Sequence, residues 1–398
     1  MKRIYLDNSA TTAVDPPVLE AMIPYFVEDF GNASSVHLFG QKAKAAVEAA
    51  RAQVAELIGA DPREVVFTSG GTEADNLAVK GAAWALANYG RHIITSKIEH
   101  PAVYNCCQQL EQRGFEVTYL PVDETGLIRL DELERALRDD TILISVMAAN
   151  NEIGTLQPIA EIGQMVAAWR RRQHTSYPYV HTDAVQAVGK IPINVDEWGV
   201  DLLSLSGHKI HAPKGIGALY VRQGIRLEAH MHGGHHERDR RAGTENVPGI
   251  VGLGKAAELA REHGAEWMNR VRELRDYMET EIERRIPDVV FNGHRQRRVP
   301  NVCNCSFRSI QGEALMIRLD LRGVAVSTGS ACASGSIEPS PVLLALGRDR
   351  ELARGSIRIS LSKNTTREEI DEALEILTQE VEALRAMSPL ERTATTQA

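Results

Sequence analysis

Residues 201–209, with the sequence DLLSLSGHK, place an apolar segment directly before a lysine. The segment at 201–205 has the composition of a strand buried on both faces, as in a parallel sheet. In open α/β sheets, ligands collect beyond the carboxyl ends of such strands. Lys209 is therefore predicted to emerge at a ligand site, where its amine could form a Schiff base with a carbonyl cofactor.

A second apolar run, residues 179–186 with the sequence YVHTDAVQ, places a carboxylate at a similar position. Enzymes that use pyridoxal phosphate need a carboxylate beside the pyridine nitrogen of the cofactor. Asp183 is the candidate, because an ionised aspartate keeps that nitrogen protonated and lets the ring accept electrons. Together, Asp183 and Lys209 predict a pyridoxal phosphate site.

Helical and strand patterns alternate through the first part of the chain. Helices are predicted at 41–58 and 73–89, and strands at 64–69, 93–96 and 141–148. This alternation is typical of a mainly parallel sheet with helices on both faces.

After residue 249 the pattern changes to a long helix, a few strands and a last helix. The long helix has an apolar stripe formed by Trp267, Val271, Leu274, Met278 and Ile282. The last helix is predicted to begin at a capping box, residues 366–369, and to face the core with Ile370, Leu374, Leu377, Val381 and Leu384.

This change of pattern predicts two domains. The large domain is expected at 15–261, and a smaller domain at 1–14 and 262–398. Residues 388–398 are polar and aperiodic, and are predicted to be a disordered tail.

Length and charge limit the possible functions. The chain has 398 residues and a net charge of -8, which argues against binding nucleic acid through the phosphate backbone. The N-terminus lacks the apolar core of a signal peptide, and no run of eighteen apolar residues could cross a membrane. A cytoplasmic protein without direct nucleic-acid or membrane partners is expected.

The chain has five cysteines, an odd number that favours reduced thiols over a disulfide framework. Cys106 and Cys107 in a predicted helix, and Cys303 and Cys305 in a predicted strand, are expected to be structural. Cys332 differs, because residues 327–336, STGSACASGS, contain no bulky apolar anchor. We predict a mobile loop that carries a nucleophilic thiol.

Residues 69–76, with the sequence SGGTEADN, follow a predicted strand and open a predicted helix. Glycine flexibility, a hydroxyl and backbone amides at a positive helix end suit a phosphate. The alternative is an ordinary strand-to-helix turn capped by Thr72. Because Asp183 and Lys209 already predict a pyridoxal phosphate site, a phosphate-binding turn is the favoured interpretation.

Four histidines occur in residues 230–236, HMHGGHH, and imidazole is a common zinc ligand. No cysteine or carboxylate ligand set accompanies them at the usual spacing. No metal site is therefore predicted.

In combination, these motifs resemble the NifS/IscS-type cysteine desulfurases of the class V aminotransferase group. The resemblance covers nearly the whole chain. The matching stretches are 5–12, 31–37, the turn at Gly71, 99–100, 150–154, 181–186, 206–209, 241–244, and 330–332 through 338–340.

The resemblance implies a type I fold of pyridoxal phosphate-dependent transferases, with a mainly parallel seven-stranded sheet and a smaller α+β domain. It implies a homodimer that converts L-cysteine to L-alanine and holds the sulfur as a persulfide on Cys332, in a loop at 327–340. The sulfur is expected to pass to an iron-sulfur scaffold protein or another acceptor.

The family's site roles transfer to matching positions of this chain. By resemblance, Lys209 binds the cofactor as a Schiff base and moves the substrate α-proton, and Asp183 pairs with the ring nitrogen. His100 stacks on the ring and can relay protons. Arg358 binds the substrate carboxylate, a task suited to its planar guanidinium. By the same resemblance, Asn151 and Gln186 contact the ring oxygen, and Asn151 also contacts the substrate. The phosphate is expected to be held by Gly71, Thr72, Ser206 and His208. Thr244 is expected to reach the phosphate bound in the neighbouring subunit.

Several alternatives stay open on the sequence alone. His100 could simply begin a helix, and either His100 or Arg358 could activate the Cys332 thiol. The protein could instead be a selenocysteine lyase, an aminotransferase-like relative, or a cofactor-bearing scaffold without turnover. Cys332 favours the desulfurase over an aminotransferase, which needs no thiol in a mobile loop. A scaffold without turnover would not need Lys209, Asp183 and Arg358 together.

Overall fold

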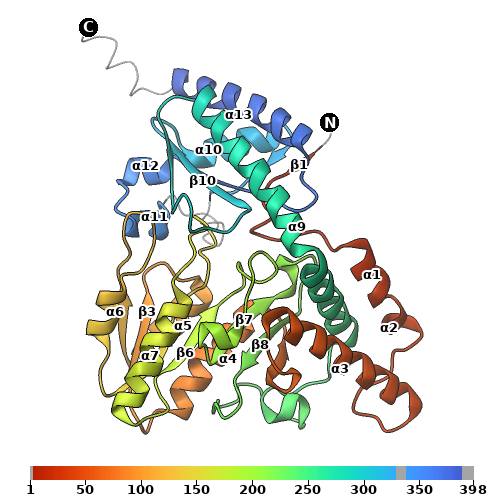
Figure 1. The fold of residues 1–398 in the computed structure, drawn as a ribbon. Coiled ribbons are helices and arrows are strands. Elements are labelled where there is room, and N and C mark those ends of the chain that lie inside the picture. The colour runs from red at the N-terminus through yellow and green to blue at the C-terminus, as the bar shows by residue number, and fades with distance from the viewer. Residues whose placement is uncertain (1–2, 329–337, 388–398) are drawn as a thin grey trace.

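The computed structural model describes residues 3–328 and 338–387 (Figure 1). The strands are β1 (Ile4–Tyr5), β2 (Val65–Thr68), β3 (His92–Ser96), β4 (Glu116–Leu120), β5 (Thr141–Ser145), β6 (Tyr179–Asp183), β7 (Leu202–Ser206), β8 (Gly217–Val221), β9 (Val289–Phe291), β10 (Val302–Phe307), β11 (Val324–Ala325) and β12 (Ser356–Ser360). The helices are α1 (Pro16–Met22), α2 (Pro24–Val27), α3 (Leu38–Ile58), α4 (Gly71–Ala85), α5 (Pro101–Glu111), α6 (Leu130–Ala136), α7 (Ile159–Gln173), α8 (Val195–Trp198), α9 (Val247–Arg285), α10 (Gly312–Leu321), α11 (Pro341–Ala345), α12 (Arg350–Arg354) and α13 (Arg367–Met387), with short 3-10 turns at Pro62–Glu64, Gly207–Lys209 and His236–Asp239.

The larger sheet has seven strands in the order β2-β8-β7-β6-β5-β3-β4. Neighbouring strands from β7 to β4 are parallel, and β8 is antiparallel to both β7 and β2. Strands β5, β6 and β7 are buried along their whole length, as expected for a sheet covered on both faces. The prediction of a mainly parallel seven-stranded sheet is confirmed.

Side chains that alternate along the strands build a core on each face of this sheet. Along β8, Ala218 belongs to one hydrophobic cluster and Leu219 to the other. Helices α3, α7 and the first part of α9 cover the first face, while α4 and α5 cover the second (Figure 1).

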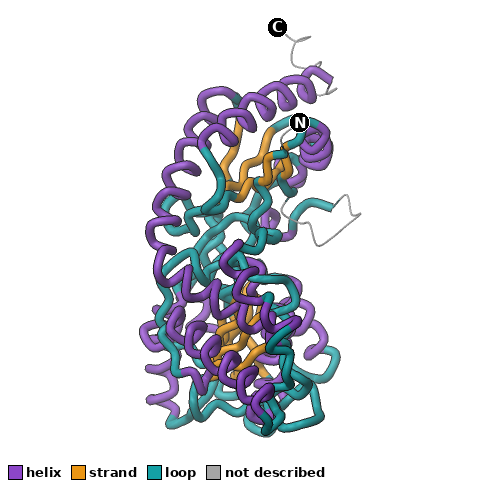
Figure 2. The backbone as a smooth tube through the Cα atoms, turned by 90° about the vertical axis from the view of Figure 1, so that its right-hand side faces the viewer, coloured by secondary structure: helices purple, strands orange, loops and turns teal. Residues whose placement is uncertain are grey.

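The smaller sheet lies at the other end of the molecule, with loops between the two (Figure 2). Its strands are antiparallel in the order β12-β10-β9, beside the parallel pair β1-β11. A separate hydrophobic cluster joins these strands to α10, α13 and the second part of α9. Because β1 pairs with β11, the N-terminus is part of this end of the molecule.

Helix α9 connects the two cores. Leu253 packs in the core of the larger sheet, whereas Val271, Met278 and Ile282 pack in the smaller one. Trp267 departs from the predicted apolar stripe, because its ring lies under the Lys363 ammonium, 3.6 Å from the ring centroid. The helix runs unbroken through the predicted domain boundary at 261/262, which stays a prediction.

The last helix begins as its sequence predicts. The hydroxyl of Thr366 accepts from the backbone N–H of Glu369, and the Glu369 carboxylate accepts from the backbone N–H of Thr366. Four of the five predicted apolar residues are fully buried, and Leu384 is partly buried against the same cluster. In the described part of the chain, every helix is too short or too polar to span a bilayer.

Candidate active site

A cavity of about 280 Å³ opens where β6 and β7 end. Its wall combines most of the predicted positions with several others: Ser9, Ala10, Gly71, Thr72, Asp75, His100, Met147, Asn151, Asp183, Val185, Gln186, Ser206, His208, Lys209 and Arg358. Most of these residues lie between positions 71 and 209, and the N-terminal segment adds Ser9 and Ala10 while β12 adds Arg358. Such a crevice beyond the carboxyl ends of strands is the usual ligand site of open α/β folds.

Lys209 closes the 3-10 turn that follows β7. The turn needs Gly207, since a Cβ there would lie 2.9 Å from the Ile216 Cγ2 atom. The Lys209 Nζ donates to the backbone carbonyls of Ser9 at 2.6 Å and Ala10 at 2.7 Å. The N-terminal segment therefore holds the lysine at the cavity.

Asp183, the last residue of β6, is buried at 5% exposure. One of its oxygens accepts from the backbone N–H of Val185 at 2.9 Å. Burial raises the pKa of Asp183, and the nearby His100 and Lys209 lower it. A buried carboxylate needs a cationic partner to stay ionised, and a protonated pyridine ring would supply one.

Asp75 is a cavity residue that the sequence analysis missed. It lies in the first half of α4 among buried apolar residues, and its Oδ1 has no hydrogen-bond partner in the described part of the protein. Burial, and secondly the Asp183 charge, raise its pKa well above the usual range. An acid on an otherwise apolar helix face was the signal that could have found it.

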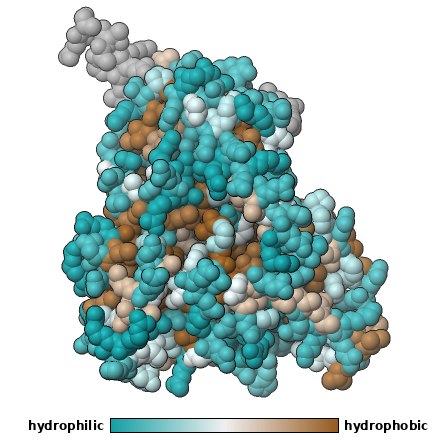
Figure 3. All heavy atoms as spheres, in the orientation of Figure 1, coloured by the Kyte–Doolittle hydropathy of each residue, from teal (hydrophilic) through white to brown (hydrophobic). Residues whose placement is uncertain are grey.

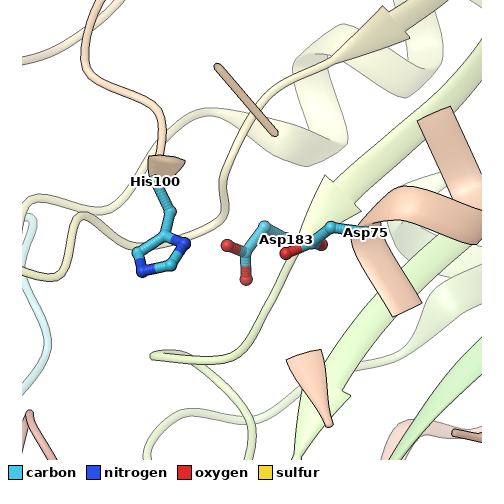
Figure 4. Close-up of side chains that lie close together, drawn as sticks. All are labelled: Asp75, His100 and Asp183. Carbon is cyan, nitrogen blue, oxygen red and sulfur yellow. The ribbon is translucent and has the colours of Figure 1, made fainter. Parts of the chain in front are cut away.

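Asp75, His100 and Asp183 point toward one another in Figure 4, and one ligand atom of each lies within 4.8 Å of the others. A third buried acid, Glu99, accepts from Ser96 Oγ at 2.6 Å and from the Met147 N–H at 3.0 Å. Burial raises the pKa of Glu99 to about 8. Three carboxyl groups in this small space cannot all be ionised, because their negative charges repel one another. Asp183 lies beside His100 and Lys209, so it is the carboxyl group most favoured to be ionised.

His100 has the helix-start position that was one of its two predicted roles. Its Nδ1 accepts from the backbone N–H of Ala102 at 3.2 Å and caps α5. The ring also lines the cavity, so the two roles are compatible. Burial lowers the pKa of His100. In the neutral ring the proton is then on Nε2, because Nδ1 is an acceptor.

The start of α4 lies open to the cavity. Gly70 is the N-cap with φ 153° and ψ −177°, and no side chain caps the helix. Thr72 is thus a residue of the first turn, not the cap that the alternative interpretation required. A Cβ on Gly71 would lie 2.8 Å from the Val185 Cγ2 atom. Uncapped amides at the positive end of a 15-residue helix fit a phosphate.

His208 lines the same cavity. Its Nδ1 lies 3.1 Å from the Thr11 Oγ1 atom. Burial, and then the positive charge of Lys209, lower the pKa of His208 to about 4, so the ring is neutral near pH 7. A neutral ring can act as a hydrogen-bond donor to an anion without adding a charge.

Arg358 in β12 is 3% exposed and lines the cavity. Its Nη1 donates to the Asn151 carbonyl at 2.8 Å, and its Nη2 donates to Asp7 Oδ1 at 2.7 Å. Its Nε is buried without a hydrogen-bond partner in the described residues. An unsatisfied guanidinium N–H at a cavity wall fits a carboxylate ligand.

Two predicted positions are not placed in this cavity. Thr244 is exposed in a loop and does not line it. Cys332 lies outside the described residues, as does the predicted tail. Ser327, the last residue but one before that gap, exchanges backbone hydrogen bonds with Arg358.

The other four cysteines are free and buried, as expected for structural thiols. Burial raises the pKa of Cys106 to about 11, and it raises the pKa of Cys107 further. Such thiols are poor nucleophiles near neutral pH.

The histidines at 230–236 have different partners. The His230 ring packs on Trp84 with centroids 4.8 Å apart, and His235 Nδ1 lies 2.6 Å from Asp239 Oδ1.

Comparisons with known proteins agree with this geometry. The family model Aminotransferase class-V matches residues 4–373. The chain is 53% identical to "Cysteine desulfurase IscS" of Dictyoglomus turgidum over 390 residues, which cover 98% of this chain and 97% of that protein. A solved "NIFS-like protein" has a TM-score of 0.89 and 39% identity, covering 96% of this chain and 100% of its own. The structure titled "SspA in complex with cysteine" has a TM-score of 0.78 and 38% identity, covering 91% of this chain and 100% of its own.

Proposed function

The chain belongs to the aminotransferase class-V family and is a pyridoxal phosphate-dependent cysteine desulfurase, and on that premise we propose how its residues perform the reaction. The cavity takes L-cysteine, releases L-alanine and retains the sulfur for an acceptor. The observation that carries this proposal is the convergence of Lys209, Asp183 and Arg358 on one cavity. Incubation of the purified protein with L-cysteine tests it, because alanine and transferable sulfur should form together.

Lys209 and Asp183, which both line the cavity, are proposed to hold the cofactor. When bound, it supplies a cationic ring that withdraws electrons from the substrate α-carbon. Lys209 would hold it covalently and move the proton at that carbon, while Asp183 would give the ring nitrogen its counter-charge. The burial of Asp183 supports its role, since a charge pair is strong away from water.

The phosphate is proposed to lie at the open start of α4. The Gly71 and Thr72 amides, with Ser206 and His208 beside them, hold it, and Thr244 of the partner subunit completes the site. The missing helix cap and the small residues at 70–71 support this assignment. His100, Asn151 and Gln186 line the same cavity, where His100 would cover the ring and Asn151 and Gln186 would contact its oxygen.

Arg358 is proposed to bind the substrate carboxylate, with Asn151 beside it. Arg358→Gln is expected to raise KM for L-cysteine and lower kcat/KM by about 10- to 100-fold, since a hydrogen bond to a charged group contributes about 1.5–3 kcal/mol. The measurement is alanine formation over a range of cysteine concentrations.

A double variant separates substrate binding from structural damage. Arg358→Gln alone leaves Asp7 without its cation, whereas Asp7→Asn with Arg358→Gln removes both charges of the pair. Arg171→Gln, at an exposed position of α7, is the matched control. Recovery of the original KM in the double variant would contradict a direct contact with substrate.

Cys332 is proposed as the nucleophile. Its thiolate forms an S–S bond with the substrate sulfur, the carbon–sulfur bond breaks, and the carbon takes up a proton to give alanine. Support comes from Ser327, whose backbone forms hydrogen bonds with the backbone of Arg358 at the cavity wall. Five residues of extended chain reach at most about 18 Å, enough to bring position 332 to the cavity.

The retained sulfur is proposed to pass to an iron-sulfur scaffold protein or to another acceptor of sulfur. The name "Cysteine desulfurase IscS" of the relative at 53% identity supports a role of this kind. The cytoplasm is the proposed location, and neither nucleic acid nor membrane is a proposed direct partner, in line with the net charge of -8.

A homodimer is proposed from an exposed apolar surface at the start of the chain, here called the N-terminal apolar surface. Its members, each at least half exposed, are Leu19, Ile23, Phe26, Val27, Phe30, Val36, Leu38 and Phe39. Figure 3 shows hydrophobic atoms at the lower right edge, where Figure 1 draws the segment between α2 and α3. A nearby polar groove is lined by Ala33 and Ser34 together with Glu245, so the loop with Thr244 lies beside this surface. Many exposed large apolar side chains in one segment favour an interface.

Phe26→Asp combined with Phe30→Asp is expected to give a monomer. Two desolvated charges at the centre of an apolar interface should weaken association by more than about 100-fold. Light scattering after size exclusion measures the mass, and the monomer should also bind the cofactor more weakly because it lacks Thr244 of the partner subunit.

Leu321→Asp is the matched control, because Leu321 is an apolar residue in α10 with 75% exposure at the other end of the molecule. It should leave the mass unchanged. A double Phe variant that keeps the mass of a dimer would refute the assignment of this surface.

A further inference from the structure

Lys190 is a buried lysine for which the proposed reaction has no role. It follows β6 and is only 9% exposed. Its Nζ donates to the Gln186 Oε1 atom at 2.7 Å. No ion pair to Lys190 is found among residues 3–328 and 338–387. Lysine is rarely buried without such a partner, so the position calls for an explanation.

The orientation of Gln186 follows from its partners. The Gln186 Nε2 donates to the Ser9 carbonyl at 2.9 Å, and the Lys209 Nζ donates to the same oxygen at 2.6 Å. A carbonyl can only accept, so the amide nitrogen faces Ser9 and the amide oxygen must face Lys190. A continuous chain of hydrogen bonds therefore joins Lys190 to Lys209.

Two cavities meet at this chain. Gln186 lines the candidate active site, whereas Lys190 lines a smaller cavity of about 30 Å³. Lys209 lines both. Lys190 thus lies behind the site, where it can contact Gln186 without touching substrate or cofactor.

The charges around Lys190 favour its neutral form. Burial, and then repulsion by Lys209 and Arg358, lower the pKa of Lys190 to about 7. The titratable and charged groups that face it from the surrounding elements are Lys209, Arg358, His208, His211 and Lys363, the last of these paired with Asp15. A neutral amine keeps its N–H donors, so it can bind Gln186 without adding a second full charge beside Lys209.

We propose that Lys190 is a positioning residue that holds the Gln186 carboxamide with its nitrogen toward Ser9 and the cofactor site. This inference rests on the proposed function, because Gln186 matters only if Lys209 carries the cofactor. A carboxamide held by Lys190 and Ser9 has one more N–H to offer to the ring oxygen. That donor stabilises a negative oxygen, which makes the nitrogen shared by Lys209 and the cofactor easier to deprotonate.

The test is a pH titration of the absorbance of the cofactor-loaded protein. Lys190→Met removes the donor while keeping the length of the side chain. The midpoint of the absorbance change is expected to rise by about one pH unit, a tenfold change in proton affinity. Gln186→Met should give a similar shift, and the double variant should add little to it, because one residue acts through the other.

Controls separate positioning from general damage. Lys363→Met removes a lysine of the same small cavity that does not contact Gln186, and should leave the midpoint unchanged. Lys190→Gln, which keeps an N–H donor, should return most of the original midpoint.

The folded protein binds fewer protons at position 190 than the unfolded chain between pH 7 and 10. Stability from this group therefore falls as pH falls through that range, and Lys190→Met should melt no lower than the parent there.

An unchanged midpoint in Lys190→Met, or shifts that add fully in the double variant, would overturn the inference. If Lys190→Met does not fold, the Lys190→Gln variant tests the inference instead. A midpoint in Lys190→Gln that is displaced as far as in Gln186→Met would also overturn the inference. A parent protein that never gains the cofactor absorbance would instead contradict the proposed function.

Discussion

Lys209→Ala is expected to abolish conversion of L-cysteine to L-alanine, with a loss of roughly 10⁴-fold or more. The variant loses the amine that holds the cofactor and also the base that moves the substrate proton. Lys190 is not placed to replace it, since that lysine is engaged with Gln186 behind the site. The protein should still fold, because Lys209 contributes two hydrogen bonds to backbone carbonyls and little to the core.

Two measurements check this result. Alanine formation reports turnover, and mass spectrometry after borohydride reduction should find a cofactor-modified peptide at position 209 in the parent but not in the variant. Lys214→Ala, an exposed lysine in the same segment, is the matched control and should retain both properties. A parent protein without a modified peptide at 209 would remove the basis of the proposed mechanism.

Cys332→Ala is expected to stop sulfur transfer while leaving substrate binding intact. Without the thiolate, no S–S bond to the substrate sulfur can form, so alanine and persulfide should both fall to background, a loss of roughly 10³-fold or more. Addition of L-cysteine should still change the absorbance of the bound cofactor, because Lys209, Asp183 and Arg358 remain. This separation of binding from sulfur release is the signature of a nucleophile that acts after the substrate is bound.

Trapping with an alkylating reagent followed by mass spectrometry measures the persulfide on each cysteine. Cys106→Ala is the control, since burial makes that thiol a poor nucleophile. Persulfide at an unchanged level in Cys332→Ala would reject the assigned role. An unperturbed thiol is only a few per cent ionised at pH 7, and whether His100 or Arg358 assists it is tested by the pH dependence of transfer in variants of each.

The sequence by itself determined the elements and much of the chemistry. Strands such as β5 and β7 are nearly continuous apolar runs, so both their existence and their burial follow from local composition. The positions of Asp183 and Lys209 were also predictable, because the carboxyl ends of neighbouring parallel strands lie at one edge of a sheet. The capping box at Thr366 needed only four residues of sequence.

Only the tertiary structure decided how residues remote in the sequence complete the site. The Ser9 carbonyl accepts from Lys209, 200 positions away, and Asp7 holds Arg358, 351 positions away. Asp75 and Lys190 became notable through burial, which depends on what packs around a residue and not on its neighbours in the chain. Local sequence limits the backbone conformation, whereas the burial of a charge and its hydrogen-bond partners depend on which distant segments meet. For that reason the roles of Ser9, Asp75 and Lys190 at the site could be found only in the tertiary structure.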